Sequence, residues 1–293
     1  MKLRVLVLLL AMIAISAPVP LSAQQKVERK LALRMDGSFR IHSMVGSVVV
    51  HGWSKDTVMV RATLPAGDQL HMGGGYTGAK MFVESENERN PKPTRLEVWV
   101  PNRARVWVKT ATASIDVRGV SGGLDLYVVS GTIDVTGNPR ELNAEAIDGD
   151  IHITGSPPWL RAKSATGAIT FRGASSDVAL STVSGAIKVE GGLFERVKVE
   201  TVTGNISFAG QLDRGTFDFD SHGGTVDIAI PENANATFGV VTIAGTIDNR
   251  LSRARPFPGR FGRGQELTFE AGAGSGKVSV RTFKGPVTLR RAP

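Results

Sequence analysis

The sequence contains no cysteine, and this absence restricts what the protein can be. Disulfide scaffolds, zinc fingers and ribbons, thiol catalysis and a cysteine-linked lipid anchor all need cysteine and are excluded. The redox environment stays open. Charged residues make up 21% and hydrophobic residues 41% of the 293 positions, a balance that is too apolar for a mainly disordered chain.

Long apolar runs are also missing, except at the N-terminus. Lys2 and Arg4 precede an almost unbroken apolar run over residues 5–15, and two prolines and a Leu-Ser-Ala stretch follow. This pattern is typical of a secretory signal peptide, which we expect over residues 1–23. The protein is therefore expected to be exported to the periplasm, the cell envelope or the medium. Because Leu21 is larger than the small residue preferred at that place, an uncleaved N-terminal anchor is the alternative.

Histidine is scarce, which limits the chemistry that can be assigned. The five histidines, at positions 42, 51, 71, 152 and 222, are scattered along the chain, so no Ser-His-Asp triad can be nominated from their spacing. His222 stands beside two glycines, where a role in a turn is the simpler interpretation. We predict no catalytic residue and no cofactor.

What the sequence does contain is an internal repeat, exemplified by Gly-Thr-Ile-Asp-Val-Thr-Gly at residues 131–137. Seven such segments begin at residues 113, 131, 149, 167, 185, 204 and 224, in steps of 18, 18, 18, 18, 19 and 20 residues. A step held over more than a hundred residues is typical of a solenoid, in which each unit buries its apolar face against its neighbours.

Each repeat holds two short strands in which apolar and polar residues alternate. The apolar columns of the first strand are Ile115, Ile133, Ile151, Ile169, Ile187, Ile206 and Val226, then Val117, Val135, Ile153, Phe171, Val189, Phe208 and Ile228. Those of the second strand are Leu124, Leu142, Leu160, Val178, Val197 and Phe217, then Leu126, Ala144, Ala162, Leu180, Val199 and Phe219. A period of two predicts that these columns point inward and the residues between them outward.

The simplest closure of such repeats is an all-β, right-handed parallel β-helix, flattened into a β-solenoid with coils of about 18 residues stacked about 4.8 Å apart. Glycine at each bend supplies a positive φ or a close backbone approach. An antiparallel meander with a regular hairpin period is the competing topology.

Residues 24–293 are expected to form one domain. Its regular repeats span residues 113–230, with an atypical N-terminal cap over 24–112 and a C-terminal cap over 231–293, because a solenoid must protect its open ends from edge pairing.

Looser copies of the unit extend into both caps. Residues 46–53 repeat the first strand, with 57–62 as the expected partner strand, and residues 285–290 are the expected last strand. Two irregular stretches, residues 67–93 and 249–264, are expected to be protruding loops or caps.

These residues resemble a bacterial family, the proposed-adhesin domain of unknown function built from β-strand repeats. The resemblance lies in Gly-Ser-Val-Val-Val-His-Gly-Trp at 46–53, in Leu-Glu-Val-Trp-Val-Pro at 96–101 with Ala-Arg-Val-Trp-Val at 104–108, and in the recurring Ser/Thr-Gly-x-Ile-x-Val pattern. It covers most of the chain after residue 23. The resemblance implies a non-catalytic β-solenoid of the cell envelope, an adhesin or interaction scaffold, and supplies no catalytic residues.

An arginine-rich stretch is the most distinctive surface feature. It contains Arg250, Arg253, Arg255, Arg260 and Arg263 together with two phenylalanines, and has no acid between residues 249 and 265. Arginine forks match phosphates and carboxylates, so we expect electrostatic binding of anionic lipid, lipopolysaccharide or acidic glycan. A solvated loop is the alternative, and an envelope protein is another partner class. Nucleic acid is not expected, despite a net charge of +8, because export separates the protein from it.

Other chemistry is weaker in the sequence. A calcium row would need repeated acids in the turns, and the pair Asp148 and Asp150 is better explained as part of a solvated turn, so no metal site is predicted. The glycine-rich stretches at 73–80 and 271–278 lack the residues of a P-loop. The main alternative function is a carbohydrate-active β-helix enzyme acting on acidic polysaccharide. Tight bends leave little to enclose a catalytic cluster, so we predict that the protein is not an enzyme.

Overall fold

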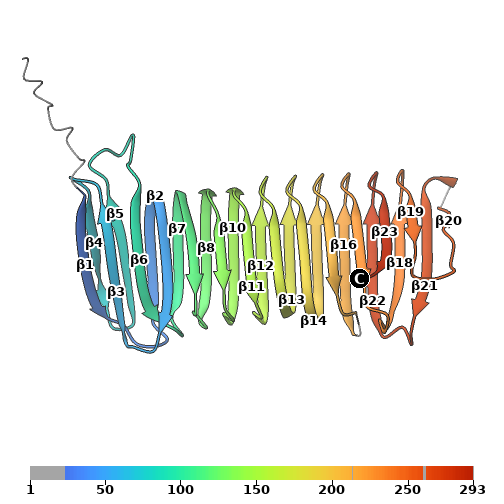
Figure 1. Cartoon of the computed structure of the whole chain (residues 1–293), viewed down its shortest axis with the longest axis horizontal. Helices are drawn as coiled ribbons and strands as arrows, with labels where there is room; N and C mark the ends of the chain where they lie inside the picture. Colours follow the sequence, from blue (N-terminus) through green and yellow to red (C-terminus); the bar gives the residue numbers. More distant parts are fainter. Residues whose placement is uncertain (1–23, 213, 260–261, 293) are drawn as a thin grey trace, which may run out of the picture.

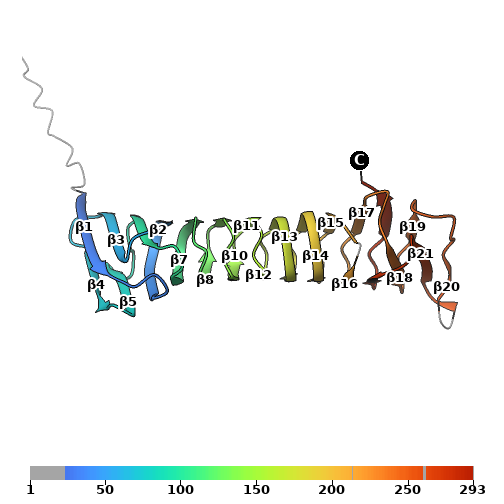
Figure 2. The same cartoon turned by 90° about the horizontal axis from the view of Figure 1, so that it is seen from below.

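The computed structural model describes residues 24–212, 214–259 and 262–292, which form an elongated all-β rod (Figures 1 and 2). The predicted signal peptide, residues 1–23, and Arg260 lie outside the described residues. Within the described ranges there is no α-helix. Accordingly, that part of the chain holds no helix with the length and apolar character needed to cross a membrane.

Strand pairing arranges the chain in two walls, and four long strands (β2, β7, β13 and β14) run from one wall into the other. The first wall contains, in spatial order, β4 (Gln69–Gly75), β5 (Gly78–Glu84), the first halves of β2 (Ser38–Trp53) and β7 (Arg105–Arg118), β8 (Gly123–Ser130), β10 (Glu141–Asp148), β12 (Trp159–Ser164), the second halves of β13 (Ile169–Thr182) and β14 (Ile187–Thr201), β16 (Gly215–Ser221), β22 (Gly276–Thr282), β18 (Ala236–Thr242), β21 (Gln265–Ala271) and β20 (Phe257–Pro258). The second wall contains β1 (Gln25–Ala32), β3 (Thr57–Leu64), β6 (Thr94–Pro101), the second halves of β2 and β7, β9 (Ile133–Thr136), β11 (Ile151–Gly155), the first halves of β13 and β14, β15 (Ile206–Gly210), β17 (Val226–Ile230), β23 (Val287–Arg291) and β19 (Ile247–Asn249).

The regular repeats are joined by parallel pairing. Ile151 pairs with Ile133 on one side and with Ile169 on the other, and Leu142 likewise lies between Leu124 and Leu160. The antiparallel meander is therefore wrong for these repeats, and the sheet is solenoid-like. Antiparallel pairs occur only toward the two ends of the described rod, as between β1 and β3 and between β18 and β21.

The predicted inward columns form the core. Ile169 and Phe171 are both 0% exposed, and every other member of the four columns is buried as well. In the C-terminal half the core widens into a cluster of rings, in which Phe208 lies 5.2 Å from Phe219 and 6.0 Å from Phe217, measured between ring centroids. The alternation of the sequence therefore sets which residues face inward.

Glycine is required at both bends of each coil. At the bend that follows each second-wall strand, Gly155 and Gly173 have φ of 147° and 145°, a conformation that favours glycine. These glycines also approach one another, since a Cβ on Gly173 would lie 1.7 Å from the carbonyl oxygen of Gly155. The close approach recurs at the bend that follows each first-wall strand, where a Cβ on Gly185 would lie 1.8 Å from the carbonyl oxygen of Gly167. Both predicted roles of the bend glycines are confirmed.

The N-terminal end differs from its prediction. Strand β3, expected to be the partner strand of residues 46–53, lies in the same wall as those residues, antiparallel to β6 and β1. The first-wall strand of that coil is instead residues 38–43, at the start of β2. Residues 67–93, expected to be a protruding loop or a cap, contain an antiparallel hairpin of β4 and β5, and this hairpin pairs with β2 at the end of the first wall. Spacing alone could not separate a solenoid coil from a strand that folds back along the wall edge.

The C-terminal end departs from chain order. The strands β22 and β23 lie between β16–β17 and β18–β19, so the coil that comes last in the sequence is inserted before the preceding one (Figure 1). Residues 285–290, expected as the last strand, do form β23 but do not end the rod. Instead β21, antiparallel to β18, and β20 cover the end of the first wall.

Candidate functional site

The arginine-rich stretch lies at the C-terminal end of the rod. Arg250 is held by Asp248, with 2.6 Å between its Nη2 and the carboxylate Oδ2. Arg253, Arg255 and Arg263 are exposed and form no ion pair with any described residue. The structure thus gives three free arginines among the four it describes, and Arg260 is outside the described residues.

Of the two forms expected for this stretch, a protruding loop or a cap, its described residues form a cap. Leu251 and Ala254 pack partly buried against the core, and Phe257 pairs antiparallel with Glu266. The Asn249 amide Nδ2 donates to the Ala254 carbonyl at 3.0 Å. The stretch therefore folds over the wall end and blocks an open edge, a structural role that a simple charge count does not reveal.

A second cationic surface, missed in the sequence, lies near the other end of the first wall. Register places Arg40 of β2 between Lys80 of β5 and Trp107 of β7, and His42 between Phe82 and Lys109. We call these six residues the cationic face: Arg40, His42, Lys80, Phe82, Trp107 and Lys109. Their side chains point outward from three neighbouring strands, β5, β2 and β7. Where these strands pair with one another, none of the outward residues is acidic.

The cations of this face are available to a ligand. Arg40, Lys80 and Lys109 are exposed and have no ion pair within the described ranges. The Arg40 guanidinium lies 5.1 Å from the Trp107 ring centroid, and the Lys109 ammonium 5.3 Å from that of Tyr127, so aromatic rings orient both groups. Acids begin only at the border, where Arg105 pairs with Asp125 at 3.2 Å.

The charges of this face act together on His42. Partial burial of the imidazole lowers the pKa of His42, and the nearby charges of Lys109, Arg40 and Lys80 lower it further. The neutral form is therefore favoured near pH 7. An anion bound among the three cations would reverse the charge effect and favour protonation of His42.

The titratable groups singled out in the sequence serve the fold. The Asp150 carboxylate accepts a hydrogen bond from the Ala168 backbone amide at 2.7 Å, and Asp148 accepts one from the Thr166 hydroxyl, so both carboxylates tie one bend to the next. His222 stacks on Phe283 at 4.8 Å between ring centroids. Across the described ranges no group of three or more His, Cys, Asp or Glu side chains could hold a metal ion.

The sequence carried only a weak signal for the cationic face. Basic and aromatic residues alternate with apolar ones at 38–43 and at 105–110, which marks them as outward. Nothing in the spacing shows that Lys80, after an irregular stretch, lies beside Arg40. Only the strand register brings the three cations together.

An all-β, solenoid-like rod with exposed cationic surfaces defines the class of this protein. The chain matches the Toastrack DUF4097 family over residues 14–290 and belongs to that family. None of the proteins with curated descriptions matches the chain in sequence.

Several solved structures are similar over most of their length. A proposed adhesin from Bacteroides fragilis is 13% identical, with a TM-score of 0.42, over 92% of this chain and 99% of that one. A proposed lipid-binding protein from Parabacteroides distasonis is 11% identical (TM-score 0.31, coverage 92% and 97%), and a proposed cell adhesion protein from Clostridium sporogenes is 7% identical (TM-score 0.25, coverage 92% and 100%).

Proposed function

We propose that this protein is an exported, non-catalytic interaction scaffold of the cell envelope, an adhesin-like rod that binds anionic polymers or surfaces. The signal-peptide pattern over residues 1–23 supports export. We also propose a right-handed winding with coils of about 18 residues in the regular repeats, because parallel β crossovers are right-handed in about 98% of cases.

The observation that carries the binding proposal is the cationic face. Three cations without acidic partners, Arg40, Lys80 and Lys109, lie on neighbouring strands of a rigid sheet. Fixed cations on a flat sheet attract a polymer that presents carboxylates or phosphates at regular intervals, and they lose little side-chain freedom on binding because aromatic rings already support two of them. The free arginines of the C-terminal stretch supply a second attachment point.

Binding should be measured with purified protein on polygalacturonate and on neutral dextran as its uncharged control. Vesicles of phosphatidylglycerol and of phosphatidylcholine distinguish a lipid source of anions from a glycan source. We expect binding only to the anionic probes, and we expect it to weaken as salt rises, since exposed charges are screened over about 8 Å at physiological ionic strength. Release of unsaturated products or new reducing ends from polygalacturonate would instead support the enzyme alternative.

Two variants separate the two cationic surfaces. Changing Arg40, Lys80 and Lys109 together to Ser should weaken binding about tenfold or more at low salt. Changing Arg253, Arg255, Arg260 and Arg263 together to Ser should weaken it less, because part of that stretch is engaged in covering the wall end.

The matched control also removes three positive charges from the first wall, by changing Arg196, Lys198 and Lys277 together to Ser. Arg196 and Lys198 are already paired with Asp177 and Glu200, so their removal should leave binding nearly unchanged. If the control and the cationic-face variant weakened binding equally, net charge would explain the attraction and the site would be rejected.

A further inference from the structure

All four tryptophans of the protein stand on the outer faces of the walls and none lies in the core. Each has an arginine or lysine group between 4.5 and 5.2 Å from its ring centroid, and the four are Trp53, Trp99, Trp107 and Trp159. Tryptophan is among the side chains that are most buried on average, and together with arginine it is enriched at interaction surfaces. Outward tryptophan–cation pairs therefore point to places where a ligand binds.

One of these tryptophans, Trp159, lines a depression of about 700 Å³ that crosses β7, β8, β10 and β12 of the first wall, and we call it the Trp159 depression. Its polar lining residues are Arg105, Asp125, Glu141, Asn143, Arg161 and Lys163. Strand register places Asn143 at the centre, between Asp125 and Arg161. The depression adjoins the cationic face, because Arg105 lies on the same strand, β7, as Trp107 and Lys109 of that face.

Gly123 of β8 opens the space that the depression occupies. It pairs with Glu141 of β10 and carries no side chain, so Arg105 reaches across it. The Arg105 Nε donates to the Asp125 carboxylate at 3.2 Å, and its Nη2 lies 3.7 Å from the Glu141 carboxylate two strands away. A Cβ on Gly123 would lie only 3.3 Å from the Arg105 Cγ. Arg105 thus partly neutralises two carboxylates at this end of the depression.

The other end of the depression offers groups that no neighbour uses. The Asn143 amide and the Lys163 ammonium have no hydrogen bond or ion pair within the described ranges. The Trp159 side chain is 38% exposed, and the Arg161 guanidinium lies 4.5 Å from its ring centroid. Arg161 is itself held by Asp177 at 2.9 Å, so the tryptophan has a fixed neighbour. An aromatic surface, an amide and a cation are therefore available side by side.

This combination matches a sugar ring that carries a carboxylate. A pyranose has an apolar face of C–H groups, which can lie on an indole ring, and a rim of hydroxyls that both donate and accept hydrogen bonds. The Asp125 and Glu141 carboxylates accept from such hydroxyls, and the Asn143 amide both donates and accepts. Lys163 is free to pair with the carboxylate of an acidic sugar. An anion without hydroxyls would gain nothing from the ring and would be repelled by the two acids.

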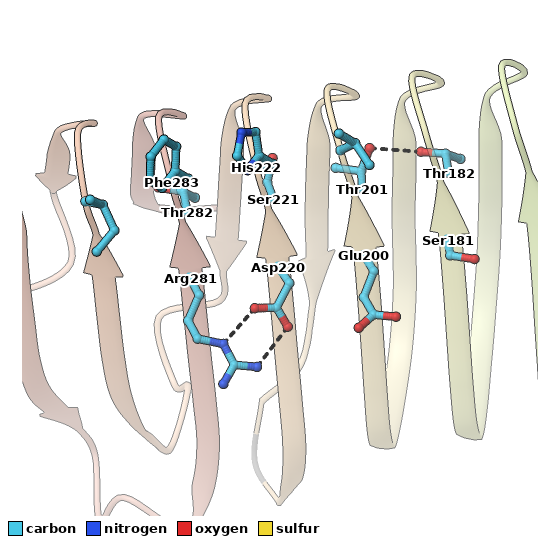
Figure 3. A pocket seen from close by; sticks show the side chains of 12 residues that line it. Ser181, Thr182, Glu200, Thr201, Asp220, Ser221, His222, Arg281, Thr282 and Phe283 are labelled. Carbon is cyan, nitrogen blue, oxygen red and sulfur yellow. Dashed lines mark hydrogen bonds and ion pairs between the residues drawn. The ribbon is translucent and has the colours of Figure 1, made fainter.

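A depression in the C-terminal half of the same wall lacks this combination (Figure 3). There the Arg281 guanidinium closes on the Asp220 carboxylate, with hydrogen bonds of 2.6 and 2.9 Å. The His222 and Phe283 rings stack on each other with an interplanar angle of 9°. Its described lining contains no tryptophan, amide side chain or lysine. The chemistry of an acidic sugar therefore fits the Trp159 depression and not this one.

We propose that the Trp159 depression binds a sugar unit of an acidic glycan. This inference rests on the proposed binding of anionic polymers by the cationic face, and it names the class of polymer. The strands from β5 to β12 are five steps apart in the first wall, a span of about 24 Å at about 4.8 Å per step, so one glycan chain running along the rod can occupy both places. The second contact of such a chain is intramolecular, which raises the affinity for a polymer above that for a single sugar.

The test compares two carboxylate polymers, polygalacturonate, which is built of sugar rings, and poly-L-glutamate, which has none. We expect the parent protein to bind polygalacturonate about tenfold more tightly at equal carboxylate concentration. Trp159→Leu should abolish this preference and leave the binding of polyglutamate unchanged. Asn143→Ala, which removes hydrogen bonds without removing charge, should weaken the binding of polygalacturonate alone, by about fivefold.

The matched control is Trp159→Phe, which keeps an aromatic ring at the same position and should retain most of the preference. All three positions of change are outward on the wall, so thermal unfolding should be similar for these variants and the parent. Changing Arg40, Lys80 and Lys109 together to Ser should weaken the binding of both polymers, because both carry carboxylates.

The outcomes separate this inference from the proposed function. Equal binding of the two polymers by the parent, or an equal loss of both in Trp159→Leu, would overturn the sugar site and leave the binding of anionic polymers standing. A preference for polygalacturonate that neither Trp159→Leu nor Asn143→Ala reduces would also overturn the sugar site. Binding of neither polymer at low salt would overturn both proposals.

Discussion

Replacing Ile169 by Asp tests the inward columns at the middle of the rod. Ile169 is 0% exposed and lies between Ile151 and Ile187 of the adjacent coils, so the new side chain would have no polar partner in its column. Loss of the buried isoleucine costs about 2–5 kcal/mol. Keeping the new carboxyl neutral at pH 7, three units above its ordinary pKa, costs about 4 kcal/mol more. The sum of about 6–9 kcal/mol is comparable to the whole stability of a typical domain.

The matched control is Thr170→Asp, one residue along the same strand. Thr170 points outward between His152 and Lys188, and a surface substitution there should change stability by about 0.5 kcal/mol or less. Thermal unfolding followed by circular dichroism, with hydrogen exchange of β11, β13 and β14, would compare the two variants. Burial raises the pKa of the introduced carboxyl, so the Ile169 variant should recover stability as the pH falls, by about 1.4 kcal/mol per unit. Equal losses for the two variants, or no recovery in acid, would refute the assignment.

Two further substitutions test the bends and the wall surface. Gly185→Ala should destabilise the protein by about 1–3 kcal/mol in chemical denaturation, because the added Cβ would lie 1.8 Å from the Gly167 carbonyl oxygen. The control is Gly73→Ala, whose Cβ would have no atom within 4 Å and which should be nearly neutral. Equal effects of the two substitutions would show that close approach does not select glycine. The hydrogen bond from Arg161 lowers the pKa of Asp177 below its ordinary value of 3.8. The stabilising contribution of the Asp177 carboxylate should therefore be present at neutral pH and lost as the pH falls through the lowered pKa. Asp177→Asn should therefore be less stable than the parent at pH 7 and equally stable in strong acid, and a difference that persisted in acid would contradict this account.

The regular repeats could be predicted closely because the sequence pattern, the strands and the stacked coils all recur with the same step. Ile133, Ile151 and Ile169 recur at a fixed step, and parallel in-register stacking is the arrangement that places each one directly on the next. The caps could not be predicted in this way. Strand β3 has the alternation of a coil strand but pairs antiparallel, and alternation says which face is buried without saying in which direction the neighbour runs.

The candidate sites, too, could be predicted only in part from the sequence. The arginine-rich stretch was visible as composition, but its packing through Leu251 and its pairing through Phe257 depend on a wall end that no local pattern describes. The bends after the first-wall strands also had a readable signal in the sequence. A Ser or Thr, an apolar residue and any residue before Gly recur at 182–185, 201–204, 242–245 and 282–285.

By itself the sequence determined the strand content, the inward columns and the stacking of the regular coils, because these follow from a short period and from burial of apolar side chains next to like side chains. Only the tertiary structure decided the order of the coils at the C-terminus, where β22 and β23 enter between β16–β17 and β18–β19. Coils with the same apolar columns fit one another in more than one order, so the columns alone do not decide it. The cationic face was decided in the same way, since Lys80 and Arg40 become neighbours only through the pairing of β5 with β2.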